Sequence, residues 1–173
     1  MLQLMFTMLL GVIILGAQSG PMPDQAKRGQ EIFLASPHAG SRCATCHSME
    51  GRGRAVGPDI RRLAGLSPKA LRIAIKSTVT AYVVTANLRN GKKFPALKGE
   101  EDDKEIVLFD LSKIPPVEGT YQKSEISSYG ANMNWKHPPA SEELTDQQLA
   151  DLIGYFRFVA KGNTRTVLPE EVQ

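Results

Sequence analysis

The chain has 173 residues, a length that fits one domain with a core of its own. Hydrophobic residues make up 42% and charged residues 23%, a mixture typical of globular proteins. The formal net charge is +3, which is too mild to indicate a protein that recognises nucleic acid through a strongly basic surface.

The first 19 residues differ from the rest of the chain. Residues 2–16 are apolar with two exceptions, and no charged residue precedes Asp24. Residues 17–19 place small side chains at the two positions that a signal peptidase reads, so we expect residues 1–19 to be a cleaved secretory signal. The segment has no Lys or Arg, which leaves an uncleaved anchor as the alternative, although the apolar run is shorter than the about 20 residues that span a membrane. We therefore expect export, with membrane contact only if the segment is retained.

A first helix is predicted to begin at Asp24, which can cap it. Ala26, Gly29 and Phe33 then share one face, at spacings of three and four residues. A glycine inside a helix costs roughly 1 kcal/mol. Gly29 is better explained if another backbone comes close to it.

The most specific pattern is residues 43–47, which read Cys-Ala-Thr-Cys-His. Two cysteines three apart, followed at once by a histidine, form the c-type haem attachment pattern. Each thiol adds to one vinyl group of the haem, and the adjacent histidine can bind the iron. A disulfide or half of a zinc site are the alternatives, but Cys43 and Cys46 are the only cysteines and zinc needs a second pair of ligands. We predict one covalent haem c, with His47 as an iron ligand.

Further along, residues 57–60 read Gly-Pro-Asp-Ile. Together with the Gly29 helix and residues 43–47, they resemble the first half of a class I cytochrome c. The resemblance implies that the carbonyl of Pro58 accepts a hydrogen bond from the other imidazole nitrogen of His47. That bond would orient the ligand and fix its tautomer.

A second helix is predicted from Pro68, with Ser67 as its N-cap. Ten basic and three acidic residues lie between residues 27 and 76. Four of the arginines would lie near the haem if the resemblance holds: Arg52, Arg54, Arg61 and Arg62. They would dock an acidic partner or pair with a haem propionate, or they are simply a solvated face.

From about residue 78 to 128 the pattern changes from helical to strand-like. Residues 82–89 alternate with period two, and Asn90-Gly91 is a strong hairpin signal. Residues 92–97 would return as an edge strand because they contain Pro95. Further strands are predicted at residues 106–109 and 120–126. This small antiparallel β unit resembles an insertion found in haem-binding domains of some large bacterial proteins, between the histidine and methionine ligands. We interpret it as scaffold or docking surface.

The second informative stretch is residues 129–139, which contain Met133, Trp135 and His137. In the family that the chain resembles, the sixth iron ligand is a methionine in an irregular loop before the last helix. The resemblance therefore implies that Met133 binds the iron, with His137 as the rival and an open site as the third reading. Trp135 would pack on the porphyrin, bond a propionate through its indole N–H, or belong to the ordinary core.

The last helix is signalled by a capping box, in which Thr145 and Gln148 satisfy each other's backbone. Its apolar stripe runs from Leu149 to Ala160, and Gly162 ends it. It resembles the terminal helix of cytochromes c, which crosses the first helix, and this gives Gly29 its reason.

We therefore predict a mainly α protein with the cytochrome c fold, in which three or more helices surround a haem and an antiparallel β unit is inserted. The expected organisation is a signal at residues 1–19, a cytochrome domain at residues 20–161 with the insertion at about 78–128, and a loose tail at residues 162–173. The expected function is an exported, periplasmic carrier of single electrons between redox protein partners. Its iron would be low-spin with His/Met ligation, and no residue is catalytic. The alternative is a peroxidase-like enzyme or gas-binding haem protein with an open sixth site.

Overall fold

The computed structural model describes residues 20–35, 43–76, 82–138 and 144–173. The predicted signal at residues 1–19 lies outside these ranges. The α-helices are α1 (Asp24–Ala35), α2 (Pro68–Lys76) and α3 (Asp146–Lys161), and the short 3-10 turns are η1 (Cys43–Thr45), η2 (Ile60–Gly65), η3 (Lys123–Glu125) and η5 (Pro169–Val172). The strands are β1 (Ser48–Met49), β2 (Arg52–Gly53), β3 (Val84–Leu88), β4 (Lys93–Glu101), β5 (Glu105–Asp110), β6 (Val117–Gln122) and β7 (Ile126–Ala131).

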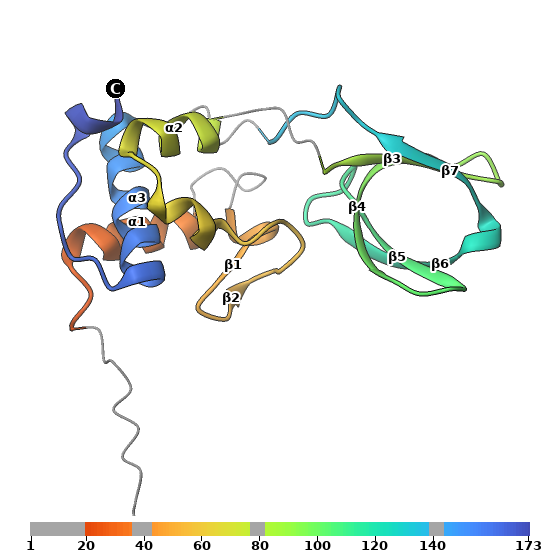
Figure 1. The fold of residues 1–173 in the computed structure, drawn as a ribbon, viewed down its shortest axis with the longest axis horizontal. Helices are drawn as coiled ribbons and strands as arrows, with labels where there is room; N and C mark the ends of the chain where they lie inside the picture. Colours follow the sequence, from red (N-terminus) through yellow and green to blue (C-terminus); the bar gives the residue numbers. More distant parts are fainter. Residues whose placement is uncertain (1–19, 36–42, 77–81, 139–143) are drawn as a thin grey trace, which may run out of the picture.

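The prediction of a mainly α fold is wrong. Of the described residues, 39% are helical and 27% lie in strands, and five of the strands form one antiparallel sheet. The physical reason is that the β unit is more than a small addition to a helical domain. Its strands are long enough to build a curled sheet with a core of its own, so the molecule combines α and β parts (Figure 1).

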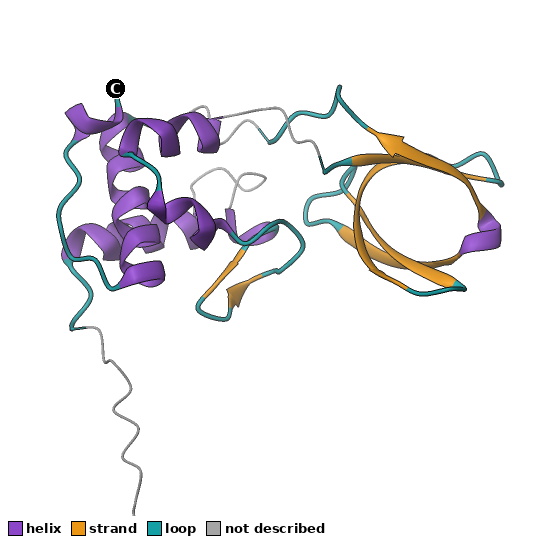
Figure 2. Cartoon of the chain, viewed as in Figure 1, coloured by secondary structure: helices purple, strands orange, loops and turns teal. Residues whose placement is uncertain are grey.

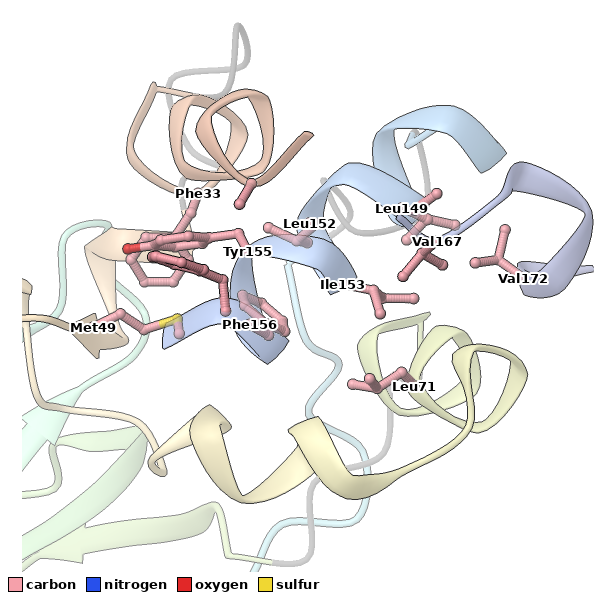
Figure 3. Packing of buried hydrophobic residues seen from close by; sticks show 13 residues of the cluster. Phe33, Met49, Leu71, Leu149, Leu152, Ile153, Tyr155, Phe156, Val167 and Val172 are labelled. Carbon is pink, nitrogen blue, oxygen red and sulfur yellow. The ribbon is translucent and has the colours of Figure 1, made fainter. Parts of the chain in front are cut away.

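The helical part is built on the crossing of α1 and α3. A Cβ atom at Gly29 would overlap the backbone carbonyl of Asp151, which confirms that another backbone comes close to this glycine. Phe33 fills the next turn of α1, and its ring lies 5.8 Å from that of Tyr155 and 6.3 Å from that of Phe156. Figure 3 shows these three rings gathered between the two helices, with Leu71 of α2 on the other side.

The predicted capping box of α3 is confirmed. The backbone N–H of Gln148 donates to Thr145 Oγ1 at 3.2 Å, and the backbone N–H of Thr145 donates to Gln148 Oε1 at 2.9 Å. The helix ends at Gly162, whose φ of 63° is the left-handed conformation that glycine adopts most readily.

The C-terminal segment is not the loose tail that we predicted. Val167 and Val172 are completely buried, and they pack in the same cluster as α2 and α3. The side-chain amide of Gln25 also bonds both backbone groups of Val167, at 2.7 and 2.8 Å. The sequence gives little sign of this, because two isolated valines form no periodic pattern.

The sheet has the strand order β6-β5-β4-β3-β7, and every neighbouring pair is antiparallel. The predicted Asn90-Gly91 turn joins β3 to β4, with Gly91 at a φ of 87°. Figure 2 shows that the sheet curls, so one face encloses a core of seven buried residues: Ala86, Leu88, Phe94, Ala96, Ile106, Leu108 and Ile126.

Two expectations about this sheet are wrong. We expected the last strand at residues 120–126, but the last strand is β7, which begins at Ile126 and pairs with β3. Strand β4 is central and not an edge, although it contains Pro95. Pro95 lies opposite Leu111, which is just past the end of β5, and its carbonyl accepts the N–H of Leu111. The N–H that proline lacks would therefore point to the place where the hydrogen bonds between β4 and β5 end, so the proline is tolerated there.

The helices and the curled sheet form separate cores within the described residues. The chain enters the sheet after α2 and leaves it after β7, on the way to α3 (Figure 1). Within the described ranges, no helix has the length and apolar character that crossing a bilayer requires.

Candidate functional site

The two cysteines lie on a tight turn at the edge of the helical core. In η1 the backbone N–H groups of Cys46 and His47 both donate to the carbonyl of Cys43, at 3.2 and 2.8 Å. Both thiols are free and partly buried. Burial raises the pKa of the Cys43 thiol to about 11 and also raises the pKa of Cys46. Both thiols are therefore protonated at neutral pH.

The imidazole of His47 is fixed by the chain that follows it. Its Nδ1 lies 2.8 Å from the carbonyl oxygen of Pro58, so the structure contains the bond that the resemblance implied. Because a carbonyl only accepts, Nδ1 carries the proton and Nε2 keeps its lone pair for a metal. Burial lowers the pKa of His47, although the Pro58 carbonyl opposes this, and the neutral ring is the form that binds metals.

Two glycines let the backbone pass close to this imidazole. A Cβ atom at Gly57 would lie 2.6 Å from Cε1 and 2.9 Å from Nδ1 of His47. Gly53 has a φ of 86°, and a Cβ atom there would overlap the carbonyl of His47. The sequence indicated Gly57 only as part of a motif and Gly53 only as part of a glycine-rich loop, with no role predicted for either glycine. The signal available was the density of glycines directly after the histidine.

A second histidine faces the first. The ring centres of His47 and His137 are 6.2 Å apart, and the ring planes differ by 28°. Burial lowers the pKa of His137, the nearby His47 ring lowers it further, and the backbone at Pro138 opposes both effects. Trp135 packs edge-on against His137, with ring centres 6.2 Å apart and an interplanar angle of 83°.

The structure does not bury Met133 beside His47. The Met133 residue is 64% exposed, while Met49, which directly follows the haem motif, is 1% exposed in the helical core. The predicted site residues Cys43, Cys46, His47 and Pro58 thus lie together, and Trp135 joins them through His137.

Two of the four arginines that we singled out are bound by neighbouring groups. Arg61 binds the carboxylate of Asp59 at 2.6–2.9 Å, and the guanidinium of Arg54 donates to the carbonyl of Pro116 at 2.7 Å. The Arg54 contact was not predicted. It joins the glycine-rich loop to the segment that leads into β6.

The donor set fits a covalently attached haem. Two thiols on one turn can form two thioether bonds, and the neutral imidazole of His47 directly follows them with Nδ1 bound to the Pro58 carbonyl, so Nε2 is the nitrogen suited to a metal. Among the described residues no three His, Cys, Asp or Glu side chains cluster closely enough to hold another metal ion, and the two cysteines form no disulfide.

Comparison with known protein families agrees with this chemistry. A family model described as "Cytochrome c" matches residues 26–159, well over half of the chain. The match includes the thiol turn, the imidazole held by Pro58, the whole sheet and nearly all of α3. A search of curated proteins finds no match.

Proposed function

The chain belongs to the cytochrome c family, and from this premise we propose that it is an exported carrier of single electrons with one haem. A cytochrome c binds haem c covalently and carries electrons between redox protein partners. The observation that carries the proposal is the pairing of the free thiols with an imidazole held by the Pro58 carbonyl.

The chain's own residues bind, orient and enclose the cofactor. Cys43 and Cys46 would hold it through two thioether bonds, and His47 would bind the iron. Pro58 keeps the His47 ring in one orientation and one tautomer, which strengthens the ligand. The haem supplies a reversible one-electron exchange at its iron.

For the opposite side of the iron, the resemblance implies Met133, and this stays a prediction. A filled sixth position suits a carrier, because it keeps small molecules from reacting at the iron. The carrier function does not depend on which residue fills it.

The experiment is a redox titration of the protein purified from a host that attaches haem c. We expect one reversible one-electron step and low-spin spectra in both oxidation states. Carbon monoxide added to the reduced protein separates this proposal from the haem enzyme or gas-binding alternative. Slow or absent binding supports the carrier, and rapid binding with a high-spin ferrous spectrum rejects it.

We also propose a periplasmic location, because residues 1–19 have the composition of a secretory signal. The measurement is the mass and N-terminal sequence of the protein recovered from the periplasm. A mature chain that begins at Gly20 supports cleavage. Retention of Met1 in a membrane fraction would show that the segment serves as an anchor.

A further inference from the structure

We propose that His137, and not Met133, binds the haem iron on the side opposite His47. This rests on the proposed function, because it presupposes a haem attached at Cys43 and Cys46. It departs from the His/Met pair that the resemblance implies.

The first support is the distance between the two imidazoles. A metal bound by two imidazole nitrogens at about 2 Å each separates the ring centres by a little over 6 Å. The His47 and His137 rings are 6.2 Å apart, with planes that differ by 28°. The spacing already present between these rings therefore matches that of a shared metal ion.

The second support is an unsatisfied polar atom. Nδ1 of His137 is buried, and no hydrogen bond of ordinary length and angle satisfies it among the described residues, although the backbone at Pro138 lies close to the ring. A buried imidazole nitrogen that is poorly satisfied costs free energy, and a bound metal ion is one explanation for such a group. A metal ion bound by the ring would compensate for the loss of water around it.

The third support is the way the loop before His137 is built. The N–H of Asn132 donates to the carbonyl of Val83 at 2.8 Å, which ties the loop to the start of β3. The side chain of Asn132 then accepts the N–H groups of Asn134 and Trp135, at 3.2 and 2.9 Å. The indole of Trp135 packs edge-on against His137 and limits the rotation of its ring. The curled sheet thus holds the segment that presents His137.

The same turn leaves Met133 exposed. Met133 is 64% exposed. It lies within the turn that the Asn132 side chain closes by accepting the N–H groups of Asn134 and Trp135. His137, by contrast, already lies across from His47, with ring centres 6.2 Å apart.

The expected consequence is a reduction potential lower than that of a His/Met haem. A thioether sulfur favours ferrous iron and raises the potential, whereas a second imidazole does not. The potential therefore reports the ligand independently of any electron-transfer rate.

The test compares three variants of the haem-loaded protein: His137→Ala, His137→Met and the control Met133→Leu. For each variant, haem staining after denaturing electrophoresis first shows whether the haem is covalently attached. The spin state is then measured by electron paramagnetic resonance, and the midpoint potential by redox titration. We expect Met133→Leu to stay low-spin with an unchanged potential. We expect His137→Ala to become high-spin, added imidazole to restore its low-spin spectrum, and His137→Met to raise the potential.

The outcomes separate this inference from the proposed function. Wild-type protein that carries no covalent haem overturns the proposed function and the inference together. Covalent haem with a low-spin His137→Ala, or with a high-spin Met133→Leu, overturns the inference alone and returns the ligand to Met133. If His137→Ala is recovered in low yield, the potential of His137→Met decides: an unchanged potential overturns the inference.

Discussion

Gly57 and Pro58 together determine where the His47 imidazole lies. The carbonyl of Pro58 accepts from Nδ1 at 2.8 Å, and the missing side chain of Gly57 leaves room for the ring. The two residues have different roles. The glycine leaves room for the imidazole to approach, and the carbonyl of the proline fixes the orientation of the ring. The His47 imidazole is thus held by a backbone carbonyl, which loses no side-chain entropy when it accepts the bond.

We expect Gly57→Ala to displace the His47 ring. The new methyl group would lie 2.6 Å from Cε1, so the ring must move and the bond to Pro58 must lengthen. Overpacking of this kind costs about 1–3 kcal/mol. The measurement is thermal unfolding of the haem-loaded protein, followed at the haem absorption band.

The matched control is Gly130→Ala, because a Cβ atom there would meet nothing within 4 Å. Equal melting temperatures for the two alanine variants would contradict the role of Gly57.

At the scale of elements, the α1–α3 crossing is the main contact of the helical part. Gly29 permits the close approach, and Arg28 beside it binds the carboxylate of Asp151 through two bonds at 2.9 and 3.0 Å. Asp151 is itself 3% exposed, so its charge is paired where water cannot reach it easily. The crossing therefore combines close backbone contact with one specific ion pair.

Gly29→Val should separate the two helices. Its Cβ would overlap the Asp151 carbonyl, and a backbone atom cannot rotate away as a side chain can, so we expect a loss of about 3 kcal/mol or more. Yield of haem-loaded protein and its melting temperature measure the effect. Gly20→Val serves as the control, since a Cβ at Gly20 meets nothing within 4 Å. A Gly29→Val protein as stable as the control would refute the helix crossing.

The end of β4 is held to η3 by a carboxylate between two lysines. Glu101 lies 2.8 Å from Lys98 Nζ and 3.0 Å from Lys123 Nζ. The hydrogen bond from Lys98, followed by that from Lys123, lowers the pKa of Glu101 from its ordinary 4.5 to about 2. The stabilisation is complete above pH 4.5 and is lost as the pH falls towards 2, because the folded state then has to take up a proton.

We therefore expect Glu101→Gln to flatten the dependence of the sheet's melting temperature on pH between about 4.5 and 2. The measurement is circular dichroism melting at several pH values in this window. Glu100→Gln is the matched control, since Glu100 makes no ion pair within the described part of the chain. Parallel curves for wild type and Glu101→Gln would show that these lysines do not stabilise the folded carboxylate.

At the scale of the whole molecule, two separate cores meet at His47 and His137. The helical core carries the thiol turn and His47, and the sheet holds the loop with Trp135 and His137. The Arg54–Pro116 hydrogen bond also joins the two parts. If His137 binds the iron as we propose, the sheet determines the position of that ligand.

Separate cores predict separate responses to core mutations. Leu108 and Leu152 are both completely buried, one in the sheet and one in α3, and replacing either with alanine should cost about 2–5 kcal/mol. We expect Leu108→Ala to lower the melting temperature of the strands. The melting temperature followed at the haem absorption band should change less. Leu152→Ala should lower the temperature of the haem transition itself. One shared transition, shifted equally by both variants, would show that the two parts unfold as one unit.

The sequence by itself determined the cofactor chemistry, the starts of the helices and the end of α3. The haem attachment pattern depends on the spacing of Cys43, Cys46 and His47 in the sequence. The capping box depends on two residues that are three apart, and the hairpin turn on the neighbouring residues Asn90 and Gly91. A local pattern is therefore enough to predict each of them. The family match then supports the haem that the pattern predicted.

Only the tertiary structure decided which distant residues meet. It placed β4 in the middle of the sheet, packed Val167 and Val172 into the helical core, and set His137 across from His47 while leaving Met133 exposed. These contacts join residues that are far apart in the chain, and their free energy comes from burial against partners that no local pattern identifies. The thiol turn is determined locally because its atoms are joined by a few bonds, whereas the position of His137 relative to His47 depends on how a sheet of some fifty residues folds back.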